Sequence, residues 1–384
     1  MHYIYISGAI SELLSDALSW SVAGNKFSIN MARALDELSC GNLSFVSTAA
    51  LPDSIDQSSL EIWKGKPLLI AKRGKHFLLS ELKLRASIKK ILRKIRLSNP
   101  EEDVAVIIEN SPFAVATAAA SLKRRLNLRL YSITIDTPFT RAFNDKGLLG
   151  KINKLLFKSG IKAMQKFDGL ISFTENVKKD LQIDIPFCQF AIGCNEEDIA
   201  GCKPNITSER TAVYAGTLIY YNGIKELIEA YALLGDEYKL DIYGYGPLED
   251  FVKEAVKKHS NISFCGRFSP CDTMGILSKY NLLINPRILD SSIENFTFPS
   301  KLIDYILAGK NVLSSEFKTL PKEYKDFIYT IDNVDPHLIS GAIIQIFADD
   351  VSAREARAEA AIEYIKENQT YKKQSESIIR FINQ

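Results

Sequence analysis

The amino-acid sequence predicts an α/β protein with two Rossmann-like parallel-sheet domains joined by a polar linker. The first observation is an alternation of short β-branched runs with helical patterns along most of the 384 residues. That alternation is typical of βαβ units and therefore of a parallel sheet. The second is a stretch rich in Gly, Pro, Asn and Ser at 193–210, after which the alternation starts again. The length also suits two to three domains.

The first half carries the first run of predicted strands. They are expected at 3–7, 43–47, 67–71, 104–109, 128–135, 169–173 and 186–192. Helical patterns fall between them, for example at 26–38 and 113–126. We place the first domain at 1–195.

The second half repeats the pattern. Strands are expected at 211–216, 239–244, 261–266, 281–286, 311–315 and 327–331, and helices at 223–234, 247–258, 271–279, 300–308 and 336–348. A long helical tail follows at 351–383. We place the second domain at 205–355, with a final helix at 356–384 that packs back toward the first domain. The default ligand site of such a fold is the cleft at the carboxyl ends of the strands.

Composition excludes several classes of protein. Hydrophobic residues make up 46% and the net charge is only +2, which fits a globular enzyme and not a polycation. Six cysteines and four histidines show no zinc spacing. The N-terminus lacks a basic signal-peptide region, and no apolar run is long enough to span a bilayer. We therefore expect a cytoplasmic protein with free thiols.

A short motif near the start of helix 300–308 combines groups that suit a nucleotide. Pro299 fits a first helical turn, which leaves its N–H free in any case. Ser300 stands at the expected N-cap, and Lys301 adds positive charge where the free N–H groups of a helix attract anions. Asp304, one turn further on, can accept hydrogen bonds from ribose hydroxyls. An ordinary capped helix would show the same residue types.

Four segments of the second half resemble a known enzyme family. They are "NPR" (285–287), "FPSK" (298–301), "VYAGTLIYYNGIKELIEAYALL" (213–234) and "LDIYGYGPLEDFVKEA" (240–255). Together they are similar to the donor-site signature of GT-B glycosyltransferases, and more narrowly to the retaining group 1, or family 4, branch that builds bacterial surface polysaccharides. The resemblance is strong over about 211–316 and architectural elsewhere. It implies a GT-B fold, two Rossmann-like domains that face a central cleft.

The resemblance also implies roles on the donor side. Ser300 would meet the pyrophosphate with Lys301 as countercharge, and Asp304 stands where the family usually has a ribose-binding Glu. Gly216 and Thr217 would form the turn under the phosphates, and Arg267 would lie near the nucleobase. Arg287 would either contact a phosphate or order its own loop. The loop residues Asn295, Phe296 and Thr297 would cover the sugar.

Two features of the wider superfamily are altered. Its pair of glutamates, eight residues apart, corresponds to Phe296 and Asp304, so nearby Glu294 is the remaining candidate for a catalytic carboxylate. Its basic pair after the glycine turn is absent, and Lys225 on the following helix can substitute for it.

The first half offers fewer candidates. Gly24 and Asn25 fit a loop that feeds a helix, where Gly lets the backbone approach a ligand and Asn can cap; a plain strand-to-helix loop is the alternative. Asp136 directly follows a predicted strand and would face the cleft. It corresponds to the Asp of a His-Asp pair in the family, with Ile135 in place of the His.

The expected reaction follows from the resemblance. A hexosyltransferase of this type moves a sugar from a UDP- or GDP-linked donor to a growing, lipid-linked bacterial glycan with retention. Asp136, Glu294 and Lys301 are the catalytic candidates, with Lys301 stabilising the departing diphosphate. No further cofactor and no metal are implied.

Two basic segments predict a partner surface. Residues 83–96 hold seven basic residues and no acid, and 150–166 repeats the pattern with five lysines. Basic amphipathic helices suit an anionic membrane, here the inner face of the plasma membrane. A solvated helix face is the alternative; nucleic acid is a third reading, against which the lack of interleaved aromatic residues speaks.

Two other functions compete with the transferase. A catalytically weak GT-B subunit that scaffolds a membrane-bound glycan assembly would explain the altered glutamate pair. A Rossmann dehydrogenase is disfavoured, because no G-x-G-x-x-G follows the first strand.

Overall fold

A computed structural model describes residues 1–11, 14, 22–52, 55, 60–74, 76–135, 147–269, 272–289 and 296–384. The chain forms two compact units. Unit 1 comprises Met1–Ile192, Asn295–Thr297 and Tyr371–Gln384, and unit 2 comprises Gly193–Glu294 and Phe298–Thr370. Each unit has its own sheet and its own apolar core.

The sheet of unit 1 is centred on the first strand. Its strands are His2–Ser7 (β1), Leu43–Ser47 (β2), Glu61–Trp63 (β3), Lys66–Ile70 (β4), Val104–Glu109 (β5), Leu128–Thr134 (β6), Gly169–Ser172 (β7) and Phe187–Gln189 (β8). They follow the order β3-β4-β2-β1-β5-β6-β7-β8, and only the β3–β4 pair is antiparallel among the described pairs. Because the chain builds outward from β1 in one direction and then returns to β5 on its other side, the topological switch point lies between β1 and β5.

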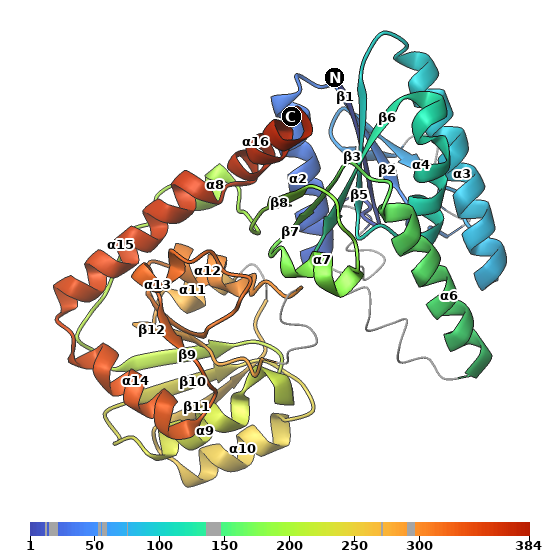
Figure 1. The fold of residues 1–384 in the computed structure, drawn as a ribbon. Helices are drawn as coiled ribbons and strands as arrows, with labels where there is room; N and C mark the ends of the chain where they lie inside the picture. Colours follow the sequence, from blue (N-terminus) through green and yellow to red (C-terminus); the bar gives the residue numbers. More distant parts are fainter. Residues whose placement is uncertain are drawn as a thin grey trace. The chain divides into compact units, whose positions relative to one another are not determined.

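Helices cover both faces of this sheet (Figure 1). They are Val22–Leu38 (α2), Phe77–Ser98 (α3), Phe113–Leu126 (α4), Gly147–Met164 (α6), Asn176–Leu181 (α7) and Tyr371–Ile382 (α16). One face packs against α3, α4 and α6, whose apolar stripes join those of the strands in a single core. On the other face α2 packs with α16, and the Phe381 ring of α16 meets Tyr131 of β6 edge to face at 5.8 Å.

Unit 2 has a parallel sheet of order β11-β10-β9-β12-β13-β14. Its strands are Thr211–Ala215 (β9), Lys239–Tyr243 (β10), Ile262–Gly266 (β11), Leu282–Asn285 (β12), Asn311–Ser315 (β13) and Tyr329–Ile331 (β14). Its helices are Glu196–Ile199 (α8), the 3₁₀ turn Tyr220–Asn222 (η1), Ile224–Ala232 (α9), Glu249–Lys258 (α10), Thr273–Leu277 (α11), Lys301–Leu307 (α12), Tyr324–Phe327 (α13), Pro336–Ala348 (α14) and Val351–Asn368 (α15). The switch point lies between β9 and β12.

The predicted strands are all present, and two details differ from the sequence-based prediction. The short strand β3 was not predicted, because three residues carry no periodic signal. The predicted tail helix is two helices, and contacts assign α15 to unit 2 and α16 to unit 1. A residue far away in the sequence contacts the break between the two helices: the Gln369 side chain accepts a 2.5 Å hydrogen bond from the buried Tyr324 hydroxyl.

Candidate functional site: a cavity in unit 2

A cavity of about 340 Å³ lies at the carboxyl ends of β9, β10 and β11. Its lining comes from the turns after these strands and from α11 and α12: Ala215, Gly216, Thr217, Gly244, Tyr245, Arg267, Phe268, Thr273, Leu277, Lys301, Asp304 and Tyr305. Five of the predicted donor-side residues are among them. This edge of a doubly wound sheet is where such folds bind ligands.

Two glycines let the turns of β9 and β10 approach closely. A Cβ at Gly244 would stand 1.8 Å from the carbonyl oxygen of Gly216, and φ at Gly244 is +150°. A Cβ at Gly216 would stand 2.1 Å from the Lys301 Nζ atom. Only glycine fits at 244, and a side chain at 216 would have to displace the ammonium group. The cavity therefore has a wall of bare backbone at this point.

Lys301 extends from the first turn of α12 toward the end of β9. Its ammonium group donates a 3.0 Å hydrogen bond to the carbonyl of Ala215 and lies 5.7 Å from the centre of the Tyr214 ring. Burial, first, and then the positive charge of Arg287 lower the pKa of Lys301, and Asp304 opposes them; the result is a pKa of about 8. The fold therefore holds a destabilised cation at the cavity.

Arg287 is the second cation of this region, although it is not among the lining residues. Burial also lowers the pKa of Arg287. The loop that carries it is fixed, because the Ser315 hydroxyl donates a 2.7 Å hydrogen bond to its carbonyl. Two partly desolvated cations that repel each other are stabilised by an anion placed between or beside them.

The other end of the cavity is aromatic. The Arg267 guanidinium lies 4.0 Å from the centre of the Tyr245 ring, a cation–π distance. The Phe268 ring meets Tyr243 of β10 edge to face at 5.6 Å. Sequence reasoning identified Arg267 but missed Tyr245 and Phe268, because aromatic residues in turns follow no periodic pattern. A flat ligand ring can stack on such a surface.

Two predictions about α12 differ in outcome. Asp304 is exposed and lines the cavity, as a ribose-binding acid requires. Ser300 does stand at the N-cap position, but its side chain makes no capping hydrogen bond and does not line the cavity. Its φ and ψ of −53° and −28° are already helical, and a cap hydroxyl needs extended backbone to reach back to the helix.

Several predicted donor-side residues lie elsewhere in the described structure. Lys225 lies 5.3 Å from the ring centre of Phe251, on the side of α9 that faces α10, and is not among the lining residues. Phe296 is only 2% exposed and belongs to the apolar core of unit 1, and Thr297 is half-buried. Asp136, Glu294 and Asn295 fall outside the described residues.

The predicted loop around Gly24 and Asn25 is helical, which corrects the expectation from the sequence. Helix α2 begins at Val22, so Asn25 lies in its first turn and does not cap it. The buried Asn25 side chain has a long-range partner instead, because it accepts a 2.9 Å hydrogen bond from the backbone N–H of Ile10. A local motif could not reveal that partner.

A carboxylate missed by sequence reasoning stands at the switch point of unit 1. Glu109 ends β5, and its Oε2 atom accepts hydrogen bonds from Tyr5 of β1 (3.2 Å) and Ser28 of α2 (2.6 Å). The next two residues, Asn110 and Ser111, both have positive φ, at 51° and 35°. Successive non-glycine residues of this kind store strain, which is concentrated at functional sites.

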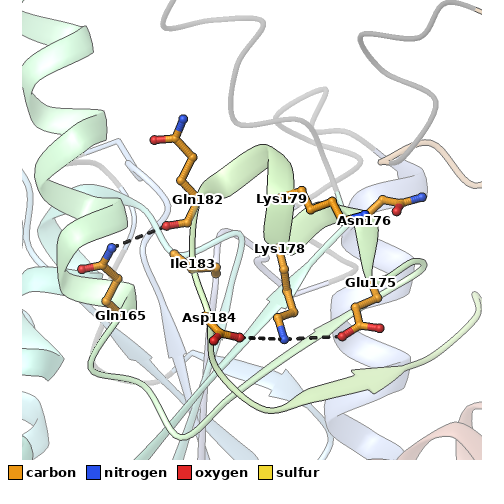
Figure 2. A pocket seen from close by; sticks show the side chains of 8 residues that line it. All are labelled: Gln165, Glu175, Asn176, Lys178, Lys179, Gln182, Ile183 and Asp184. Atoms are coloured by element: carbon orange, nitrogen blue, oxygen red, sulfur yellow. Dashed lines mark hydrogen bonds and ion pairs between the residues drawn. The ribbon is translucent and has the colours of Figure 1, made fainter.

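A larger cavity of about 660 Å³ in unit 1 is a poorer anion site (Figure 2). It lies between the end of α6 and α7. Its Lys178 ammonium is shared between Asp184 at 3.1 Å and Glu175 at 3.4 Å. The hydrogen bond to Asp184 raises the pKa of Lys178. Because two carboxylates already neutralise this lysine, the unit 2 cavity is the better candidate.

Two searches of the described residues complete the survey. None of their helices is both long enough and apolar enough to cross a bilayer. Nor do His, Cys, Asp or Glu side chains gather there in a group of three that could hold a metal ion.

Comparison with known families assigns the second half of the chain. Residues 197–367 match the family described as "Glycosyl transferases group 1". This segment is similar to group 1 glycosyl transferases over that range. It includes the whole lining of the unit 2 cavity. The match confirms the predicted class of enzyme. A search of curated protein sequences finds no match to the chain.

Solved structures extend the likeness to the whole fold. The Alr3699/HepE protein of Anabaena, in complex with UDP, has a TM-score of 0.68 at 11% identity, with 100% of both chains covered. Sucrose-phosphate synthase from Thermosynechococcus elongatus has a TM-score of 0.67 at 13% identity, covering 100% of this chain and 98% of that one. A mutant of TarM from S. aureus gives 0.51 at 17% identity over 78% and 59% of the two chains. The chain thus shares the GT-B fold, as predicted.

Proposed function

We propose that this chain transfers a hexose from a nucleotide-diphosphate sugar, with UDP as the nucleotide, to a bacterial surface glycan, with retention. The observation that carries the proposal is the pair of partly desolvated cations, Lys301 and Arg287, beside a glycine-walled cavity at the switch point of the transferase domain. A diphosphate is the anion that such a site accommodates, because bare backbone and paired cations approach phosphate oxygens closely.

The residues suggest how the chemistry is divided. The Lys301 ammonium stabilises the negative charge that builds on the diphosphate as the sugar–phosphate bond breaks. Arg287 adds a second charge at longer range. Asp304 accepts hydrogen bonds from ribose hydroxyls, and the base lies toward Tyr245, Arg267 and Phe268. The acceptor hydroxyl then attacks the face that the nucleotide leaves and gives its proton to the departing diphosphate.

The choice of UDP is supported by structural neighbours. HepE was solved with UDP and with UDP-glucose, and the TarM mutant with UDP. These proteins share the fold at low sequence identity, so the nucleotide is part of the proposal for this chain.

We assign the acceptor to unit 1 and to a lipid-linked glycan, with the enzyme on the cytoplasmic face of the membrane. Support comes from the basic segments 83–96 and 150–166, and from the TarM mutant solved with α-GlcNAc-glycerol. Glu109, held at the β1/β5 switch point, is the carboxylate proposed to bind acceptor hydroxyls. Glu109→Gln should therefore slow transfer to added glycosides and leave hydrolysis of the donor unchanged; equal loss of both would contradict this role.

A nucleotide panel tests the donor site. UDP-, GDP- and ADP-sugars are compared by thermal shift and by release of nucleotide, and we expect UDP-sugars to stabilise the protein most. No stabilisation by any nucleotide would refute the transferase. Stabilisation without turnover on any acceptor would instead favour a catalytically weak subunit of a glycan assembly.

A matched pair of glycine variants locates the site within the domain. In Gly216→Ala the new methyl group displaces the Lys301 ammonium, so UDP should bind about 10- to 100-fold more weakly, the value of one hydrogen bond to a charged group. In the control, Gly341→Ala on α14, the added Cβ has no atom within 4 Å. Equal affinities for the two variants would mean that the pyrophosphate lies elsewhere.

A further inference from the structure

The basic residues of unit 1 gather on one layer of helices. α3, α4 and α6 pack side by side over the same face of the sheet (Figure 1). They carry fourteen basic residues, seven in α3, three in α4 and four in α6, and a single acid, Glu81. The whole chain has 48 basic and 46 acidic residues, so the rest of the molecule is net acidic.

Most of these cations point to solvent. The exposed ones are Lys83, Lys90, Arg93, Lys94, Arg124, Arg125, Lys151, Lys154, Lys158 and Lys162. The pair on α4 was not part of the sequence-based prediction, since three basic residues at a helix end usually serve the helix dipole. Because α4 packs against both α3 and α6, this pair lies on the helix between the two basic helices and belongs to the same layer.

This concentration of charge works against folding. Burial, together with the neighbouring charges of Arg85 and Arg93, lowers the pKa of Lys89. Like charges four residues apart on a helix repel and destabilise it. A cationic layer that the fold itself opposes indicates a binding partner of opposite charge.

One end of α3 adds exposed apolar side chains. Phe77, Leu78, Leu79 and Leu82 are 42% to 60% exposed. On α6, which packs on the other side of α4, Leu155 is 67% exposed. Large apolar side chains that gather in one place on a surface mark an interaction site. Here they adjoin the cations, which is the composition of an interfacial helix.

We propose that the layer α3–α4–α6 docks unit 1 on an anionic phospholipid bilayer, with the Phe77–Leu82 end of α3 entering the headgroup region. Nucleic acid would satisfy the charges but leave these leucines in water. Among the described side chains of the three helices, Phe77 is the only exposed aromatic ring, whereas stacking along a nucleic-acid strand uses several. The inference deepens the proposed function by naming the lipid surface and how unit 1 meets it, yet its test needs neither donor nor acceptor.

Vesicle sedimentation with the full chain tests the cationic layer. Wild-type protein should pellet with vesicles of phosphatidylcholine containing phosphatidylglycerol, and be released by high salt. Arg93→Glu/Lys94→Glu should lower the partition coefficient at least roughly 10-fold, since each basic residue near an anionic bilayer contributes roughly a 5-fold factor. The matched control is Lys257→Glu/Lys258→Glu, an adjacent exposed pair on α10, which should bind as the wild type does.

A second pair of variants tests the apolar end. Leu78→Ser/Leu79→Ser should weaken binding that persists at intermediate salt, whereas Leu338→Ser/Ile344→Ser on α14, also about half exposed, should not. Leu82→Trp should shift its fluorescence to the blue on anionic vesicles.

Three results would overturn the proposal. They are no binding to anionic vesicles, equal binding to neutral vesicles, and equal effects of the paired variants. If the protein binds vesicles but no UDP-sugar, this inference stands and the proposed function is refuted. If it binds UDP-sugars but no vesicles, the proposed transferase activity stands and this inference is refuted.

Discussion

At the scale of single residues, the proposed donor site contains a lysine with a strongly lowered pKa. Lys301 has a pKa of about 8 instead of 10.5, because burial and Arg287 both disfavour its proton. Its proton is therefore lost at a pH at which other lysines stay charged. A bound diphosphate would restore the charge, so ligand binding and protonation are linked.

The affinity for UDP should therefore fall as the pH rises through about 8. Above that value Lys301 is neutral in the free protein, and affinity should drop by about 10-fold per pH unit, since one unit corresponds to about 1.4 kcal/mol. Calorimetric titration between about pH 7 and pH 10 measures it. Lys301→Arg is the control, because its guanidinium stays charged and its profile should be flat. A flat profile for the wild type would contradict the assignment.

The same shift affects stability in the opposite direction. Below pH 8 Lys301 is protonated in both the folded and the unfolded chain, so its burial penalty is constant. Between about 8 and 10.5 the unfolded chain binds a proton that the folded chain does not. The contribution of this group to the free energy of unfolding therefore rises with pH across that window.

At the scale of elements, two of the sequence motifs are in contact. The turn before α9 meets the "NPR" loop after β12: a Cβ at Gly223 would stand 1.7 Å from the carbonyl oxygen of Pro286, and φ at Gly223 is +65°. The Ile288 N–H donates a 2.9 Å hydrogen bond to the carbonyl of Tyr221 in the same region. The glycine turn thus fixes the loop that carries Arg287.

Gly223→Ala should consequently destabilise the protein by about 3–5 kcal/mol, as a severe backbone clash does. Gly266→Ala is the matched control, because φ is +73° there but a Cβ would meet no atom within 4 Å. That variant should lose only about 1–2 kcal/mol, the penalty of the left-handed conformation. Denaturant unfolding followed by circular dichroism compares the two, and equal losses would rule out the clash.

Elements that are stabilised by residues close in sequence could be predicted, and features that depend on residues far apart in sequence could not. The strands were found because buried β-branched runs are a local signal, and the α12 motif because Lys301 and Asp304 lie within one helical turn. The start of α2 and the break at Gln369 were missed, and their partners Ile10 and Tyr324 lie far away in the sequence. Glu109 was overlooked because its partners come from β1 and α2.

At the scale of the whole molecule, the chain builds two cores and divides its tail between them. α15 completes unit 2, where Ile365 is fully buried, and α16 completes unit 1, where Ile378 is fully buried. A single helical tail is therefore shared by two units. A destabilising substitution in either helix should therefore lower the stability of the unit to which that helix belongs.

Ile378→Ala and Ile365→Ala form a pair that tests this division. Each truncation of a buried side chain should remove about 2–5 kcal/mol. In calorimetry, Ile378→Ala should lower the transition that UDP does not affect, and Ile365→Ala the one that UDP raises. If both variants shift the same transition, the two units unfold as one.

The contact between Gly216 and Gly244 restricts how this enzyme could be re-engineered. A side chain at 244 would meet backbone, which no rotamer change relieves, and one at 216 would displace the Lys301 ammonium group, which we propose to bind the donor. Tyr245, Arg267 and Phe268 line the same cavity and already carry side chains, so exchanging them adds no new Cβ atom. A variant library intended to alter nucleotide preference should diversify these three positions and keep both glycines constant.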